Sequence, residues 1–327
     1  MLSNGHASML LWSILHLTGT RAVNAEYERL GQPAVSLDDI RHFRQLGSKA
    51  PGHPEYHLVS GVEATTGPLG QGIANSVGMA IAEAWLANRY NRPDFKIFDY
   101  DTYAVCGDGC MMEGVGAEAA SLAGHLALDN LCWIYDNNHI TIEGNTRITF
   151  TEDVAARFLG YGWNVLRVGD ANDIERIEQA LAIFRETKHR PTFIILDTHI
   201  GYGAPHKHDT SAAHGEPLGE EEIRLAKRFY GWPEDAKFLV PEAVRQHFVT
   251  GIGARGREAR RQWTELFAAY RTKYPMLATE IDLMQRRELP EGWDRGCRFF
   301  PPIQKASPVA MSRVRSSIYS PRIFPGC

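Results

Sequence analysis

Cysteine is scarce in this sequence, and the spacings that would give it a structural role are missing. The five cysteines include no C-x-x-C pair, which excludes the usual spacing of zinc and thioredoxin-like sites. A scattered, odd-numbered set is typical of reduced thiols, so we expect a cytoplasmic protein. No apolar run reaches the roughly 18 residues that a membrane helix needs. The apolar stretch 9–17 has no Lys or Arg before it, which argues against a secretion signal.

Positive charge is not in excess, and negative charge disappears from one end of the chain. The formal net charge is −4, which gives no reason to expect nucleic-acid binding. Residues 295–327 contain six Lys or Arg, several prolines and no Asp or Glu. We therefore interpret residues 1–293 as one domain with a helical extension at its end, and residues 294–327 as a disordered or foreign tail.

Apolar patterns alternate between strand and helix through the middle of the chain. Short apolar strands are expected at residues 103–106, 131–135, 163–168 and 192–197. Helical patterns are expected at residues 6–17, 73–89, 112–126, 151–159, 173–187 and, with a break at Pro275, across 219–291. Residues 20–35 look irregular. This alternation predicts an α/β fold, a parallel sheet with helices on both faces.

Polar residues follow two successive predicted strands. Gly107-Asp-Gly109 follows the first and Asp136-Asn-Asn138 follows the second. Neighbouring parallel strands lie about 5 Å apart, and ligands bind at their carboxyl ends. Asp108 and Asn138 should therefore converge, and their oxygen atoms suit a hard cation such as Mg²⁺, or Ca²⁺ or Mn²⁺ in its place. The adjacent glycines and helix start would admit a phosphate group.

The pairing of these two motifs resembles the thiamine diphosphate motif of a whole enzyme superfamily, in which Gly-Asp-Gly precedes Asn-Asn by 26 or 27 residues. Further motifs narrow the resemblance to the transketolase family. They occur in the family's order at residues 2–6, 51–55, 65–72, 107–114 and 214–219. The resemblance covers about residues 1–293 and implies the thiamine-diphosphate-binding fold of the pyrophosphate type.

The resemblance also implies roles for individual residues. The metal would be held by Asp108, Asn138 and the backbone carbonyl of Ile140. The residues that would contact thiamine diphosphate are His6, Gly67, Pro68, Leu69, Gly109, Asn138 and His214. The residues that would act in catalysis are His6, His53 and His214. Glu113 resembles a glutamate at the family's subunit interface.

The implied reaction transfers a two-carbon ketol unit from a ketose phosphate to an aldose phosphate, as in the pentose phosphate pathway. The family also uses a pyrimidine-binding domain, and nothing in residues 219–327 resembles it. We therefore expect a homodimer, or a hetero-oligomer with a pyrimidine-binding subunit, and no activity from the isolated chain. The alternative is a non-catalytic transketolase fragment, or a subunit that binds cofactor or dimerises.

Other functions remain open at this point. A related thiamine enzyme such as dihydroxyacetone synthase shares most of these motifs. A nicotinamide dehydrogenase fits less well, because Asn75 stands where the dinucleotide fingerprint that begins at Gly70 requires glycine. A metal site built from His206, His208 and His214 is a further alternative.

Overall fold

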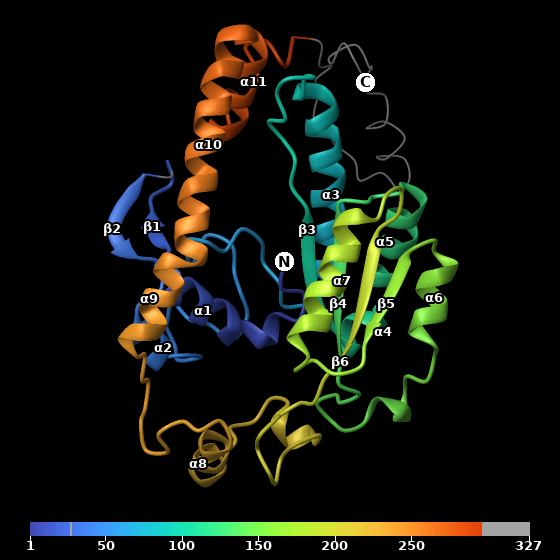
Figure 1. Cartoon of the computed structure of the whole chain (residues 1–327), viewed down its shortest axis with the longest axis vertical. Coiled ribbons are helices and arrows are strands. Elements are labelled where there is room, and N and C mark those ends of the chain that lie inside the picture. Colours follow the sequence, from blue (N-terminus) through green and yellow to red (C-terminus); the bar gives the residue numbers. More distant parts are fainter. Residues whose placement is uncertain (27, 296–327) are drawn as a thin grey trace, which may run out of the picture. The chain divides into compact units, whose positions relative to one another are not determined.

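The structure is a computed structural model that describes residues 1–26 and 28–295 (Figure 1). The chain divides into two compact units, Met1–Trp263 and Thr264–Cys327. The first unit contains the central sheet, and the described part of the second is helical. The sequence-based boundary near residue 293 stays a prediction, and nearly all of the tail expected beyond it lies outside the described residues.

A four-stranded parallel sheet forms the centre of the first unit, with the strand order β3-β4-β6-β5. Its strands are β3 (Thr102–Gly107), β4 (Leu131–Asn137), β5 (Asn164–Val168) and β6 (Thr192–Asp197). All three pairings are parallel. Each strand was expected within a few residues, so the predicted α/β fold with a parallel sheet is confirmed.

Helices pack on both faces of this sheet because side chains alternate along each strand (Figure 1). Trp133 of β4 belongs to a core with four helices, α3 (Gln71–Tyr90), α4 (Asp108–Met112), α5 (Gly114–His125) and α6 (Val154–Gly160). Its neighbour Cys132 faces the other way and packs with α7 (Ile174–Glu186). Both of these β4 residues are fully buried, which explains why β4 appears as a continuous apolar run.

The segment before the sheet differs from expectation in one place. The predicted first helix appears as η1 (Gly5–Ala7) followed by α1 (Ser8–Leu17). Residues 20–35, expected to be irregular, instead contain an antiparallel ribbon of β1 (Arg21–Val23) and β2 (Arg29–Pro33). Every side chain of β2 is exposed, so this strand carries no apolar alternation from which to predict it.

Of α4 and the remaining helices, four lie within the helical region predicted across residues 219–291, whereas the short helices at residues 108–112, 146–148 and 211–213 were not predicted. The remaining helices are α2 (Leu37–Arg41), η2 (Thr146–Ile148), η3 (Ser211–Ala213), α8 (Glu220–Phe229), α9 (Glu242–Thr250), α10 (Ile252–Lys273) and α11 (Pro275–Arg286). Pro275 occupies the first turn of α11, where its missing N–H costs nothing. Among the described residues, no helix combines the length and the apolar character that crossing a bilayer would require.

Candidate functional site

Asp108 lies at the carboxyl edge of the sheet, directly after β3. Gly107 pairs with Asp136 of β4, so the two polar motifs leave the sheet side by side. Asp108 is only 4% exposed. Its carboxylate accepts a hydrogen bond of 2.6 Å from the Tyr135 hydroxyl and one of 3.1 Å from the backbone N–H of His139. The carboxylate therefore reaches across to the residue that follows Asn138.

The Asn138 side chain stabilises the turn that leaves β4. Its amide oxygen accepts the backbone N–H of Ile140 at 2.9 Å, and its amide nitrogen donates to Asp136 at 3.2 Å. His139 between them has a left-handed backbone, with φ of 61°. This conformation is uncommon for a non-glycine residue and turns the chain sharply at the sheet edge.

The backbone carbonyl of Ile140 was the third predicted metal ligand. Ile140 forms an isolated antiparallel bridge with Asn145. The two hydrogen bonds of this bridge run from Thr146 N–H to the His139 carbonyl and from Thr141 N–H to the Gly144 carbonyl. Neither of these two hydrogen bonds uses the Ile140 carbonyl oxygen.

Two acidic groups at this edge have perturbed acidity. Burial raises the pKa of Asp108, while the hydrogen bond from Tyr135 acts in the opposite direction. Burial likewise raises the pKa of Asp136, against hydrogen bonds from Thr198 and Asn138. A nearby cation would stabilise the charged form of these buried carboxyl groups, which is otherwise poorly solvated.

Two histidines from distant parts of the sequence meet near this edge. The rings of His6, in η1, and His214, directly after η3, are stacked with centroids 5.1 Å apart and an interplanar angle of 22°. Burial, together with the nearby His214, His53 and Arg44, lowers the pKa of His6 to about 4. His6 is therefore neutral near pH 7 and offers an uncharged imidazole.

His214 connects the histidine pair to the acidic edge. Burial lowers its pKa, while the carboxylates of Asp136 and Asp108 act in the opposite direction. Its Nδ1 atom is buried and has no hydrogen-bond partner among the described residues. A buried ring nitrogen without a partner is costly, and a bound ligand could satisfy it.

Residues 67–70 of the glycine-rich motif lie against the chain around His6 and against the acidic edge of the sheet. A Cβ atom at Gly5 would lie 2.2 Å from the Thr66 carbonyl oxygen, so the chain beside His6 touches the start of this segment. A Cβ at Gly67 would lie 4.0 Å from the exposed ring of His53. The structure therefore places His53 and the glycine-rich motif next to His6.

Leu69 extends from the same segment to the sheet edge. A Cβ at Gly109 would lie 2.7 Å from a Leu69 methyl group, so a larger residue at position 109 would displace the Leu69 side chain. Pro68, between Gly67 and Leu69, is exposed. Glu113 is exposed as well, at the break between α4 and α5, and its interface role stays a prediction.

The structure thus gathers the predicted residues, but it also adds partners that sequence reasoning missed. Tyr135 and Arg44 were not among the candidates, although each acts on a candidate side chain. The alternation of β4 could have indicated Tyr135, which lies two residues after the buried Trp133 on the same face. No sequence signal indicated Arg44. The ligand roles of the candidates stay predictions.

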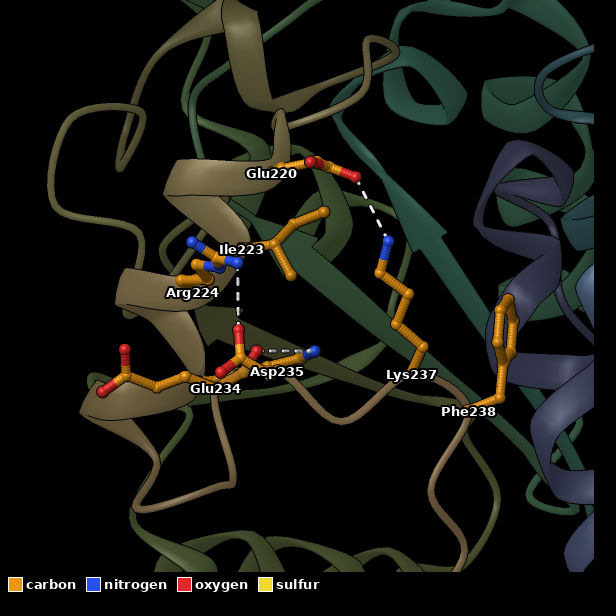
Figure 2. Close-up of a pocket in the computed structure, with 8 residues that line it drawn as sticks. Glu220, Ile223, Arg224, Glu234, Asp235, Lys237 and Phe238 are labelled. Atoms are coloured by element: carbon orange, nitrogen blue, oxygen red, sulfur yellow. Dashed lines mark hydrogen bonds and ion pairs between the residues drawn. The ribbon is translucent and has the colours of Figure 1, made fainter.

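A cavity of about 530 Å³ lies elsewhere, beside α8 (Figure 2). Its charged side chains pair with one another: Lys237 with Glu220 at 3.1 Å, and Arg224 with Asp235 at 3.0 Å. Lys227 donates to the carbonyls of Glu234 and Ala236. Because these charges are already paired, the cavity offers little to a charged ligand, and none of the predicted site residues lines it.

Residues 1–290 match the family described as transketolase, thiamine diphosphate binding domain. The chain belongs to this family. It is 50% identical to a transketolase of Geobacillus stearothermophilus over 90% of this chain and 42% of the relative. It is 47% identical to transketolase 1 of Saccharomyces cerevisiae over 90% of this chain and 41% of the relative.

Solved structures agree with this membership. A transketolase from Pichia stipitis in complex with sedoheptulose 7-phosphate superimposes with a TM-score of 0.85 at 44% identity, covering 94% of this chain and 43% of that one. A transketolase from Leishmania mexicana superimposes with a TM-score of 0.84 at 42% identity, covering 92% of this chain and 43% of that one. The chain therefore spans less than half the length of the relatives it matches.

Proposed function

We propose that this chain is the cofactor- and metal-binding half of a transketolase. It would help to transfer a two-carbon ketol unit from a ketose phosphate to an aldose phosphate, using thiamine diphosphate and Mg²⁺. The observation that carries the proposal is the reach of the buried Asp108 carboxylate across the sheet edge to His139, beside Asn138. Family membership supplies the cofactor, which the family description names.

The donor atoms at this edge fit a hard divalent cation. The Asp108 carboxylate, the Asn138 amide oxygen and the Ile140 carbonyl are all oxygen atoms, and Mg²⁺ prefers oxygen ligands with water or phosphate completing its shell. Each Asp108 carboxylate oxygen accepts one hydrogen bond, Oδ1 from the Tyr135 hydroxyl and Oδ2 from the backbone N–H of His139. Each oxygen keeps a further lone pair. The carboxylate can therefore keep these bonds and bind a cation.

Thiamine diphosphate, when bound, would supply the electron sink for breaking and forming the carbon–carbon bond. This chain's residues would position it. Gly109 and Asn138 would hold the diphosphate, and Gly67, Pro68 and Leu69 would line its rings. His6, His53 and His214 would bind the substrate and move hydroxyl protons, a role that suits the neutral imidazole of His6. The Nδ1 atom of His214 has no hydrogen-bond partner in the described part of the chain, which supports its role beside a ligand.

The catalytic unit would need a pyrimidine-binding domain from a second chain, either in a dimer of this family's type or in a hetero-oligomer. The substrates would be sugar phosphates of the pentose phosphate pathway, and the compartment the cytoplasm. The matched region is less than half of each transketolase relative, which supports a contribution from a further domain.

Calorimetry tests the binding half of this proposal. Thiamine diphosphate should bind the wild-type chain in the presence of Mg²⁺, and Asp108→Asn and Asn138→Ala should each weaken binding by more than about tenfold. Asp170→Asn is the matched control, because Asp170 is an exposed carboxylate beyond β5 at the same edge of the sheet. Equal affinity in all four proteins would refute the assignment.

An activity assay tests the catalytic half. Ketol transfer from xylulose 5-phosphate to ribose 5-phosphate should be absent with the chain alone and should appear when a polypeptide carrying a transketolase pyrimidine-binding domain is added. Cofactor binding without any reconstituted activity would favour the alternative of a non-catalytic subunit.

A further inference from the structure

The loop between β6 and α8 carries three histidines ahead of His214. One of them, His206, is held by Glu222 at the start of α8, through its backbone N–H at 2.7 Å and its ring Nδ1 at 2.9 Å. The other two, His199 and His208, come together with Asp209 instead. The alternative metal set of His206, His208 and His214 is therefore not the one that the fold assembles.

The three side chains present their ligand atoms to one another. His199 Nδ1 lies 3.0 Å from Asp209 Oδ2, and His208 Nε2 lies 3.2 Å from the same oxygen. All three ligand atoms fall within 4.8 Å of one another. The two imidazole rings are 5.0 Å apart and nearly perpendicular, at 76°. Two such rings can both direct a nitrogen at one point.

The backbone of the loop builds this arrangement. Asp209 has a left-handed conformation, with φ of 55°, and its N–H donates to the Ile200 carbonyl at 3.0 Å. This bond places Asp209 beside His199, ten positions earlier in the sequence. The N–H of His208 donates to the Ala204 carbonyl at 2.9 Å. A non-glycine residue held at positive φ costs energy and therefore needs support from its surroundings.

One nitrogen of the cluster is not satisfied by hydrogen bonding. His208 Nε2 is a buried atom that has no hydrogen-bond partner among the described residues, even though Asp209 Oδ2 is 3.2 Å away. Its distance to the carboxylate suits two ligands of one ion, because donors bound at about 2.0–2.1 Å in a tetrahedron are separated by about 3.3 Å. The rings of Tyr202 and His208 are 5.7 Å apart, so an aromatic side chain flanks the cluster.

We propose that His199, His208 and Asp209 form a second metal site, for Zn²⁺ or a similar transition-metal ion. Two imidazole nitrogens and one carboxylate suit borderline ions such as Zn²⁺, whereas the all-oxygen donors at Asp108 suit Mg²⁺. Three protein ligands leave a fourth position open to water. The site does not depend on the proposed function, because none of its residues belongs to the cofactor or substrate groups.

A bound ion would also order the segment that leads to His214. The Thr210 carbonyl accepts the N–H of Ala213, and the Ser211 carbonyl accepts the N–H of His214. These bonds connect Asp209 to His214 through the short helix η3. Zn²⁺ binding should therefore raise the resistance of this loop to proteolysis.

Titration of the tag-free chain with Zn²⁺ tests the site, in excess Mg²⁺ so that the hard-cation site is already filled. The wild type should bind about one equivalent, and Co²⁺ in its place should develop visible absorption bands. His208→Gln and Asp209→Asn should each weaken binding by more than about tenfold. Asparagine tolerates the left-handed backbone at position 209, so this variant preserves the loop.

His206→Gln is the matched control, because it removes a histidine of the same loop that lies outside the cluster. It should bind Zn²⁺ as the wild type does, and circular dichroism should show that all four proteins are folded. Absence of Zn²⁺ binding in the wild type would overturn the proposal. Equal Zn²⁺ affinities in the wild type and the Asp209→Asn variant would also overturn it, because they would show that the Asp209 carboxylate takes part only in hydrogen bonds and does not bind the ion.

Discussion

Tyr135→Phe isolates the contribution of one hydroxyl to the acidic edge of the site. The hydroxyl donates to the buried Asp108 carboxylate at 2.6 Å, a length typical of a charge-assisted bond. The ring of Tyr135 stacks on Phe193 with centroids 5.7 Å apart, and phenylalanine would keep that contact. The substitution therefore removes the hydrogen bond and little else.

We expect two effects of this substitution. The free energy of unfolding should fall by about 1.5–3 kcal/mol, because a buried carboxylate oxygen loses its donor. The affinity for Mg²⁺ with thiamine diphosphate should fall roughly 10- to 100-fold, because Tyr135 orients the proposed ligand Asp108. Urea denaturation measures the first effect, and calorimetry measures the second.

Tyr103→Phe is the control for this experiment. Tyr103 lies on the neighbouring strand β3, and its hydroxyl makes a longer, exposed bond of 3.4 Å to Asp101. Its ring contact with Phe184, at 5.2 Å, would also survive. Stability should change by less than about 0.5 kcal/mol, and cofactor affinity should not change. Equal effects of the two substitutions would exclude the proposed role of the Tyr135–Asp108 hydrogen bond.

Two further predictions concern the chain around His6. Gly5→Ala should lower the free energy of unfolding by about 1–3 kcal/mol, because its Cβ would lie 2.2 Å from the Thr66 carbonyl oxygen. Gly78→Ala in α3, where a Cβ meets nothing within 4 Å, should instead be neutral or stabilising in the same urea assay. Because the pKa of folded His6 is about 4 and that of an unfolded histidine about 6.5, protons bind the unfolded chain more tightly. The free energy of unfolding of the wild type should therefore fall, relative to that of His6→Gln, as the pH decreases from about 6.5 to 4. The expected fall is about 1–2 kcal/mol after allowance for partial exposure. Parallel pH profiles of the two proteins would contradict this.

Sequence patterns predicted the central strands of the sheet because β4 and β6 are largely buried on both faces. Residues such as Trp133 and Cys132 leave a continuous apolar signal that turn residues interrupt. The ribbon of β1 and β2 left no such signal, since every side chain of β2 is exposed. The break between α4 and α5 was missed as well. There, a Cβ at Gly70 would lie 2.8 Å from Glu113, a tertiary contact that local propensity does not encode.

The residues of the candidate site likewise divide into those that sequence patterns could predict and those that they could not. Asp108 and Asn138 could be predicted from the residues themselves, because each follows a recognisable strand. His6 lies in the short helix η1, and His53 and His214 lie on irregular segments. Only the family resemblance pointed to these three residues. The cluster of His199, His208 and Asp209 depends on a left-handed residue and a loop closure, neither of which has a periodic signature.

The position of a bound divalent ion would test the proposed metal site more directly than any other measurement. Crystals grown with Mn²⁺ and thiamine diphosphate would locate the ion by its anomalous scattering. We expect a peak about 2.1 Å from oxygen atoms of Asp108, Asn138 and Ile140. Bound cofactor with its metal at any other residues would rule out this site.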